Sequence, residues 1–183
     1  MSELLLSFYR NTYVPESCVN IDTIHEHWNF HNLEVEHGYI QWLFPTFEKS
    51  NVVNAPVLTN DLLQKMTIDV HVMLRFLYSY KLMLKFLGSK LVDFTTGTLQ
   101  RCSGFVCRAN NLNDHKHNFL RITRMLKSLQ AFGFGHYAHH FFDSIMDYVK
   151  DGYIVISKEN VQHWLNARTV SYTHLTLPTT SAV

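Results

Sequence analysis

The segment 60–87 constrains the fold more than any other part of this sequence, because its apolar residues recur every three or four positions. That spacing places them on one face of an α-helix. Further apolar residues such as Leu63, Leu74 and Phe76 fall on other sides, which predicts a helix that is buried on more than one face. We expect Thr59 to cap this helix and Gly88 to end it. The residues on the main face are Leu62, Met66, Val70, Met73, Leu77, Tyr80, Leu84 and Leu87.

Helix signals also dominate the rest of the chain. Asp22 and Ser157 are suitable N-caps, and Pro45 and Gly133 are suitable stops. Residues 88–113 are rich in Thr, Gly and Asn, and we expect an ordered connection there with at most short helical turns. The further helices are expected at 3–10, 23–28, 33–44, 114–132, 135–150 and 158–167.

Strand composition is limited to Tyr153-Ile154-Val155-Ile156, and four apolar residues without a partner segment cannot form a stable sheet. The sequence therefore predicts an all-α fold, a single compact multi-helix domain with a long buried central helix and no substantial sheet.

Composition favours one ordinary globular domain over residues 1–168. The chain has 183 residues, of which 46% are hydrophobic and 17% charged. Its formal net charge of +1 argues against a dedicated nucleic-acid-binding protein, which normally carries a strongly basic domain. No segment approaches the roughly 18 uninterrupted apolar residues that a membrane span needs. We expect a soluble protein of the cytoplasm or nucleus.

Residues 169–183, TVSYTHLTLPTTSAV, differ from the rest of the chain. They contain five threonines, no charged residue and no apolar periodicity. The string SYTHLTLPT looks like translated sequencing-adapter read-through. We therefore interpret this segment as a non-native, disordered tail and exclude it from the fold.

Cysteine and nucleophile patterns give no sign of catalysis. Cys18, Cys102 and Cys107 include no CxxC pair and are expected to be free, reduced thiols. The sequence contains no GxSxG, GxxxxGK[ST] or GxGxxG motif. We expect a protein that is not an enzyme.

Twelve histidines make metal binding worth testing. His136 and His140 of an HxxHH string would share one helix face at a spacing that suits zinc. No third ligand or general base lies at motif spacing, and no HExxH is present. We therefore expect surface or hydrogen-bonded histidines, with no metal and no cofactor. The remaining clustered histidines are His139 and two HxH pairs, His25 with His27 and His115 with His117.

A cationic face is predicted on the 114–132 helix. His117, Arg121, Arg124 and Ser128 recur at helical spacing, opposite the apolar residues. Such a face is either simply solvated, or it offers paired arginines to a peptide carboxylate, a phosphate or an acidic partner.

Six blocks of sequence occur together in the order and approximate spacing of a known family. The chain resembles the conserved N-terminal region of the opioid growth factor receptors. The resemblance implies an all-helical, non-catalytic domain that binds the peptide Met-enkephalin, restrains growth and lies in the cytoplasm or nucleus, with association at the nuclear envelope. The blocks are FYRN at 8–11, IHEHW at 24–28, EHGYIQWLFP at 36–45, YKLMLKFLG at 80–88, TGTLQR at 96–101 and LRITRMLKSL at 120–129.

A receptor for a Tyr-Gly-Gly-Phe-Met peptide needs aromatic pockets, a carboxylate for the peptide amine and an arginine for the peptide carboxylate. We take as candidate peptide-binding residues five side chains that supply these residue types: Glu36, Tyr39, Trp42, Arg121 and Arg124. The alternative is a helical scaffold or nucleic-acid-associated module that uses the Arg121/Arg124 face. An enzyme of unrecognised type is a third reading.

Overall fold

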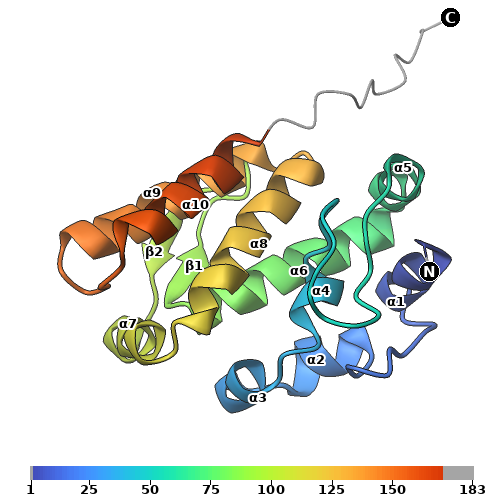
Figure 1. Ribbon diagram of the computed structural model, residues 1–183, viewed down its shortest axis with the longest axis horizontal. Coiled ribbons are helices and arrows are strands. Elements are labelled where there is room, and N and C mark those ends of the chain that lie inside the picture. Colours follow the sequence, from blue (N-terminus) through green and yellow to red (C-terminus); the bar gives the residue numbers. More distant parts are fainter. Residues whose placement is uncertain (1, 171–183) are drawn as a thin grey trace, which may run out of the picture.

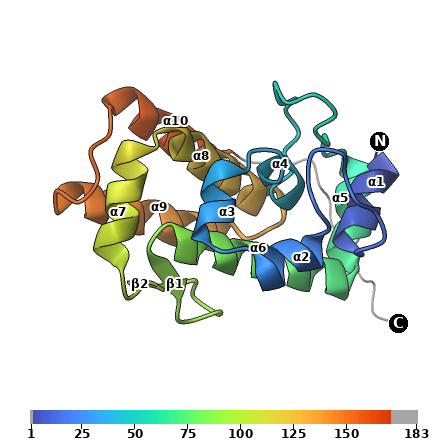
Figure 2. The ribbon, with the colours of Figure 1, turned by 90° about the horizontal axis from the view of Figure 1, so that it is seen from below.

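The computed structural model describes residues 2–170, and within them the chain is mostly helical (Figures 1 and 2). The one sheet in this part of the chain is a short antiparallel hairpin. The elements are α1 (Ser2–Tyr9), α2 (Ile21–His27), α3 (Phe30–Val35), α4 (Ile40–Leu43), α5 (Asn60–Ile68), α6 (Val70–Phe86), β1 (Ser89–Leu91), β2 (Leu99–Arg101), α7 (Phe105–Asp114), α8 (His117–Ala131), α9 (Gly135–Lys150) and α10 (Lys158–Thr169).

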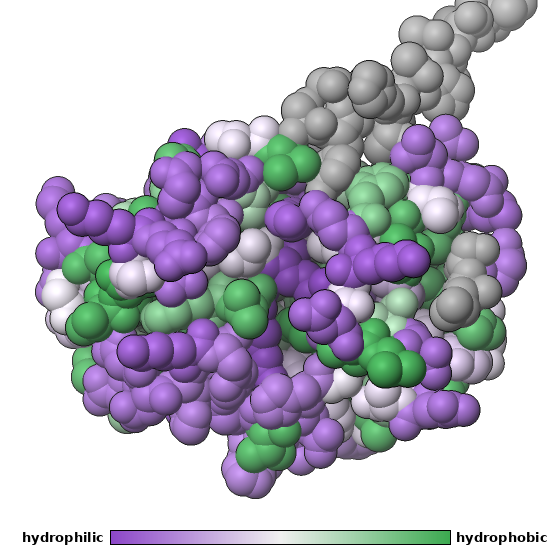
Figure 3. Space-filling model, in the orientation of Figure 1, coloured by the Kyte–Doolittle hydropathy of each residue, from purple (hydrophilic) through white to green (hydrophobic). Residues whose placement is uncertain are grey.

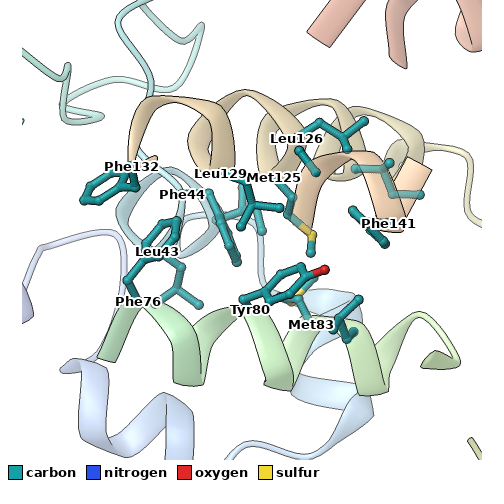
Figure 4. Packing of buried hydrophobic residues seen from close by; sticks show 14 of the residues in the cluster. Leu43, Phe44, Phe76, Tyr80, Met83, Met125, Leu126, Leu129, Phe132 and Phe141 are labelled. Atoms are coloured by element: carbon teal, nitrogen blue, oxygen red, sulfur yellow. The ribbon is translucent and has the colours of Figure 1, made fainter. Parts of the chain in front are cut away.

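Helix α6 lies along the middle of the molecule, and α8 crosses over it (Figures 1 and 2). Figure 4 shows Tyr80 and Met83 of α6 facing Met125 and Leu129 of α8 across a continuous apolar layer. The Phe76 ring stacks on Phe132 with ring centroids 4.3 Å apart. Each such side chain contributes roughly 1.5–3 kcal/mol when it is fully buried. The predicted all-α fold with a buried central helix is confirmed.

The predicted 60–87 helix is two helices, so that single-helix prediction is wrong. Asp69 has an extended backbone between α5 and α6, with φ −90° and ψ 105°. Its carboxylate accepts hydrogen bonds from the backbone N–H groups of His71 and Val72, and it pairs with Arg10 at 2.9 Å. A side-chain acceptor at this position satisfies amides that the helix start leaves unpaired. The apolar spacing continues through the break, which is why periodicity does not reveal it.

The predicted 33–44 helix is also two short helices, α3 and α4. Asn29 caps α3 by accepting from the N–H groups of His31 and Asn32. The chain is extended at Glu36, where φ is −79° and ψ is 142°. A Cβ atom at Gly38 would lie 2.0 Å from the carbonyl oxygen of Ser17, so the tertiary packing requires glycine there.

The 88–113 segment is more regular than the sequence predicts. Strands β1 and β2 pair antiparallel, with Lys90 opposite Gln100. Helix α7 follows with 10 residues, so the prediction of a connection with at most short helical turns is wrong. The apolar side chains of α7 (Phe105, Ala109 and Leu112) are buried at helical spacing, but the Asn-rich composition between them hides that pattern.

The remaining boundaries agree with the sequence more closely. Ser157 caps α10 as predicted, and 153–156 forms no strand. Asn20, not Asp22, caps α2. Helix α8 begins at His117, three residues later than predicted. Helix α10 includes Thr169, and the predicted tail beyond 170 lies outside the described residues.

No helix in the part of the chain that the structure describes is both long and apolar enough to cross a membrane. The face seen in Figure 3 mixes hydrophilic and hydrophobic residues, and its middle is hollowed and hydrophilic.

Candidate functional site

Arg121 of α8 binds the C-terminal end of α3. Its Nη1 donates to the carbonyl of Leu33 at 2.7 Å and to Oδ1 of Asn118 at 3.0 Å. Its Nη2 donates to the carbonyls of Glu34 at 3.3 Å and Glu36 at 2.6 Å. The last carbonyls of a helix lack partners within the helix and carry partial negative charge. A guanidinium satisfies several of them at once, and we call this arrangement the Arg121 clasp.

The clasp is buried and brings three of the five candidate residues together. Arg121 is only 5% exposed, so the predicted cationic face does not simply face solvent. Its guanidinium carbon lies 5.4 Å from the centroid of the Tyr39 ring. The Tyr39 hydroxyl donates to the carbonyl of Leu33 at 2.8 Å. Glu36 joins through its backbone, and its side chain is exposed.

Arg124 lies one helical turn further along α8 in a different environment. Its Nε and Nη2 atoms are buried, and they have no hydrogen-bond partner within residues 2–170. Burial lowers the pKa of Arg124 to about 10, and the nearby Glu48 carboxylate only partly opposes this effect. The guanidinium is therefore still charged at neutral pH. Unsatisfied buried donors are rare, and each one calls for an explanation, such as a bound water, an ion or a functional role.

Trp42 does not lie with the clasp. Its ring contacts Phe8, with centroids 5.4 Å apart, and Tyr13, with centroids 5.8 Å apart. The ring of Tyr39 packs instead against Trp28, with centroids 5.1 Å apart. The two aromatic residues of the 39–42 turn thus have different neighbours, although both are buried.

The Glu34 carboxylate lies beside the clasp, and the sequence analysis did not select this residue. Asn111 of α7 donates to Oε2 at 2.5 Å, and Asn118 of α8 donates to the same oxygen at 3.1 Å. His117 Nε2 is 2.6 Å from Oε1, and His115 Nδ1 is 4.0 Å from the same atom. Residues from three helices and one turn therefore meet at a single carboxylate.

The charges of this cluster are set by its surroundings. Burial raises the pKa of Glu34, but hydrogen bonds from Asn111 and Asn118 and the nearby histidines outweigh burial, and the pKa is lowered. Burial is also the main reason why the pKa of His117 is lowered, and the Arg121 charge adds to that effect. At neutral pH the cluster therefore pairs an ionised carboxylate with a neutral His117 imidazole.

The other histidines and cysteines that the sequence singled out are not gathered into this site. His136, His139 and His140 are exposed on α9, and His139 Nδ1 lies 2.6 Å from the carbonyl of Gly135. The three cysteines are free thiols. Burial raises the pKa of Cys18 to about 11, which makes it a poor nucleophile.

Comparison with known proteins identifies the family. The profile described as "Opioid growth factor receptor (OGFr) conserved region" matches residues 2–171. The chain belongs to this family. No solved structure matches it.

Curated relatives agree with this assignment. The opioid growth factor receptor of Mus musculus is 42% identical over 136 residues, which cover 72% of this chain and 21% of that protein. The Homo sapiens receptor is 41% identical over 136 residues, which cover 72% of this chain and 20% of that protein. Opioid growth factor receptor-like protein 1 of Mus musculus is 39% identical over 133 residues, or 70% and 28% of the two chains. The matched region thus spans between a fifth and a third of these relatives.

Proposed function

We propose that this chain is a non-catalytic receptor domain that binds a Met-enkephalin-like peptide and thereby takes part in negative regulation of cell growth, in the cytoplasm or nucleus. Membership of the opioid growth factor receptor family is the observation that carries the proposal. The relatives are much longer proteins, so growth regulation, protein partners and location at the nuclear envelope come to this chain only by analogy.

Arg124 is the best candidate to hold the peptide carboxylate. Its two unpaired donors, Nε and Nη2, are buried, so peptide entry must first uncover them; they can then form the paired hydrogen bonds that a carboxylate accepts from arginine. Arg121 serves the same site indirectly, because its donors hold the α3–α4 segment in place. The exposed carboxylate of Glu36 is available to the peptide amine. Tyr39 and Trp42 support the α3–α4 segment from inside the protein, since both rings are buried.

The alternative of a nucleic-acid-associated scaffold has less support. It requires both Arg121 and Arg124 to face phosphates, but the Arg121 guanidinium is buried and bonded to four acceptors. The net charge of +1 also gives no general attraction to nucleic acid.

A calorimetric titration of the chain with Met-enkephalin tests the proposal. We expect saturable binding with one peptide per chain. A peptide of the same composition in reversed order serves as the control and should give no saturable heat. Absence of binding, or equal binding of the reversed peptide, would contradict the proposed function.

A further inference from the structure

Glu34, His115 and His117 come together at the junction of α3 with the turn between α7 and α8. Their ligand-type atoms, one carboxylate oxygen and two imidazole nitrogens, all lie within 4.8 Å of one another. Glu34 and His117 are partly buried, and His115 is exposed, so the group is accessible from one side. We propose that these three residues form a binding site for one divalent transition-metal ion, with zinc as the first candidate. This proposal is independent of peptide binding.

The spacing of the ligand atoms fits such an ion. Zinc bonds to nitrogen and oxygen are roughly 2.0–2.2 Å long, so the ligand atoms of a tetrahedral site lie roughly 3.3 Å apart. The distances from Glu34 Oε1 are 2.6 Å to His117 Nε2 and 4.0 Å to His115 Nδ1, and they lie on either side of that value. The third pair, the two imidazole nitrogens, lies within 4.8 Å, so an ion at tetrahedral spacing requires the histidine side chains to shift.

The Nε2 atom of His117 gives a second, independent indication. It is buried and makes no hydrogen bond with residues 2–170, although Oε1 of Glu34 is close. The oxygen therefore lies away from the direction in which a ring N–H would point. A nitrogen lone pair that is buried beside a carboxylate and lacks a proton donor is suited to a metal ion.

The surroundings of Glu34 also resemble those of a metal ligand. Asn111 and Asn118 donate to the carboxylate and fix its orientation. Such outer contacts hold metal ligands in place and affect affinity strongly. His37 is a neighbour rather than a ligand, because its ring centroid is 5.1 Å from that of His117 and its Nδ1 lies 2.8 Å from the Val35 carbonyl.

The ligand set predicts which ions bind. Two imidazoles and one carboxylate suit zinc and neighbouring transition metals, whereas magnesium and calcium prefer oxygen ligands alone. Three protein ligands leave a fourth position open to water or an added ligand. A bound ion would also tie α3 to the α7–α8 turn and stabilise the folded chain.

The test uses the full chain, purified without a histidine tag and stripped with a chelator. Calorimetric titration with zinc sulfate should show one ion per chain, and magnesium chloride should give no binding. The single changes His115→Ala and His117→Ala should each weaken zinc binding at least about tenfold. The double change His136→Ala/His140→Ala is the matched control and should leave zinc affinity unchanged.

His115 makes the result interpretable, because its side chain is 48% exposed and its loss should not affect folding. Circular dichroism of each variant checks this. Failure of the unchanged chain to bind zinc stoichiometrically would overturn the proposal. So would zinc binding that survives both single changes, or that is lost in the α9 control.

Discussion

Arg121 and Arg124 are the same residue type one helical turn apart, yet their environments differ. The four donor contacts of Arg121 go to protein acceptors, whereas Nε and Nη2 of Arg124 have no acceptor within the described residues. The sequence identifies both arginines through the LRITR block but cannot separate their roles. That difference depends on where α3 ends, and α3 is remote from α8 in the chain.

Removal of the Arg121 side chain should be strongly destabilising. Arg121→Ala leaves the carbonyls of Glu34 and Glu36 without this donor and leaves the Leu33 carbonyl with the Tyr39 hydroxyl alone, and we expect a loss of about 3–5 kcal/mol in the free energy of unfolding. Urea denaturation measures this loss. The control is Arg10→Ala, because the side chain of Arg10 is 52% exposed and its ion pair should contribute less than about 1 kcal/mol. Equal effects of the two changes would show that the clasp is not structural.

His25 should make stability depend on pH. Burial lowers the pKa of His25 to about 4, from an ordinary value of 6.5, and its Nε2 lies 2.9 Å from the Ser79 hydroxyl. As the pH falls from about 6.5 to about 4, His25 therefore becomes protonated in the unfolded chain but stays neutral in the folded chain. The free energy of unfolding decreases over this pH range.

Denaturant unfolding at pH 7 and pH 4.5 measures this decrease for the unchanged chain and for His25→Asn. The variant should lose less stability between the two pH values, by roughly 1–3 kcal/mol. If the two proteins lose the same amount, His25 is not the group responsible.

At the scale of elements, the sequence predicts where helices lie better than where they break. Apolar spacing locates the segments of α5, α6 and α8, and the stop at Gly133 and the cap at Ser157 indicate where α9 and α10 begin. Apolar spacing cannot reveal the breaks at Asp69 and Glu36. The break at Asp69 depends on an N-cap that looks in the sequence like an ordinary helical aspartate. The break near Glu36 depends on contact between Gly38 and the distant residue Ser17. The short α7 is missed for a related reason, since its buried residues are separated by asparagines.

Gly38 tests the α3–α4 break directly. A Cβ atom there would lie 2.0 Å from the backbone oxygen of Ser17, which cannot move as a flexible side chain can. We expect Gly38→Ala to cost about 2–3 kcal/mol, measured by urea denaturation.

The control is Gly104→Ala, where a Cβ atom would have open space and only the left-handed backbone, with φ +81°, opposes the change. That variant should lose about 1 kcal/mol. A smaller effect at Gly38 than at Gly104 would mean that the α3–α4 segment can shift, and the described packing would be wrong.

At the scale of the whole molecule, the sequence supports the all-α class and the family, because the six blocks that carry the resemblance are contiguous strings. The site is different, since it is assembled from α3, α4, α7 and α8. Three of the five candidate residues meet at the clasp, but Trp42 packs against α1. Glu34 could not be singled out from the sequence, because its partners Asn111, Asn118 and His117 reach it only after α3 packs on α8.

We expect the Arg124 side chain to contribute to peptide binding but not to the stability of the fold. A buried cation without a partner is costly, so Arg124→Met should leave the free energy of unfolding unchanged or raise it. Urea denaturation measures this, and a loss above about 2 kcal/mol would show that Arg124 holds the fold together. If Arg124→Met is stable, any loss of peptide binding in this variant can be assigned to the missing guanidinium and not to unfolding.

The central claim is that Arg124 receives the carboxylate of a bound peptide. The most direct test is a calorimetric comparison of Met-enkephalin with its C-terminal amide, on the unchanged chain and on Arg124→Met. The unchanged chain should bind the free acid about 10–100 times more tightly, as expected for a charge-assisted hydrogen bond of about 1.5–3 kcal/mol. Arg124→Met should bind both peptides with the same, weaker affinity. Equal affinities on the unchanged chain, or a preference for the free acid that persists in Arg124→Met, would contradict the claim.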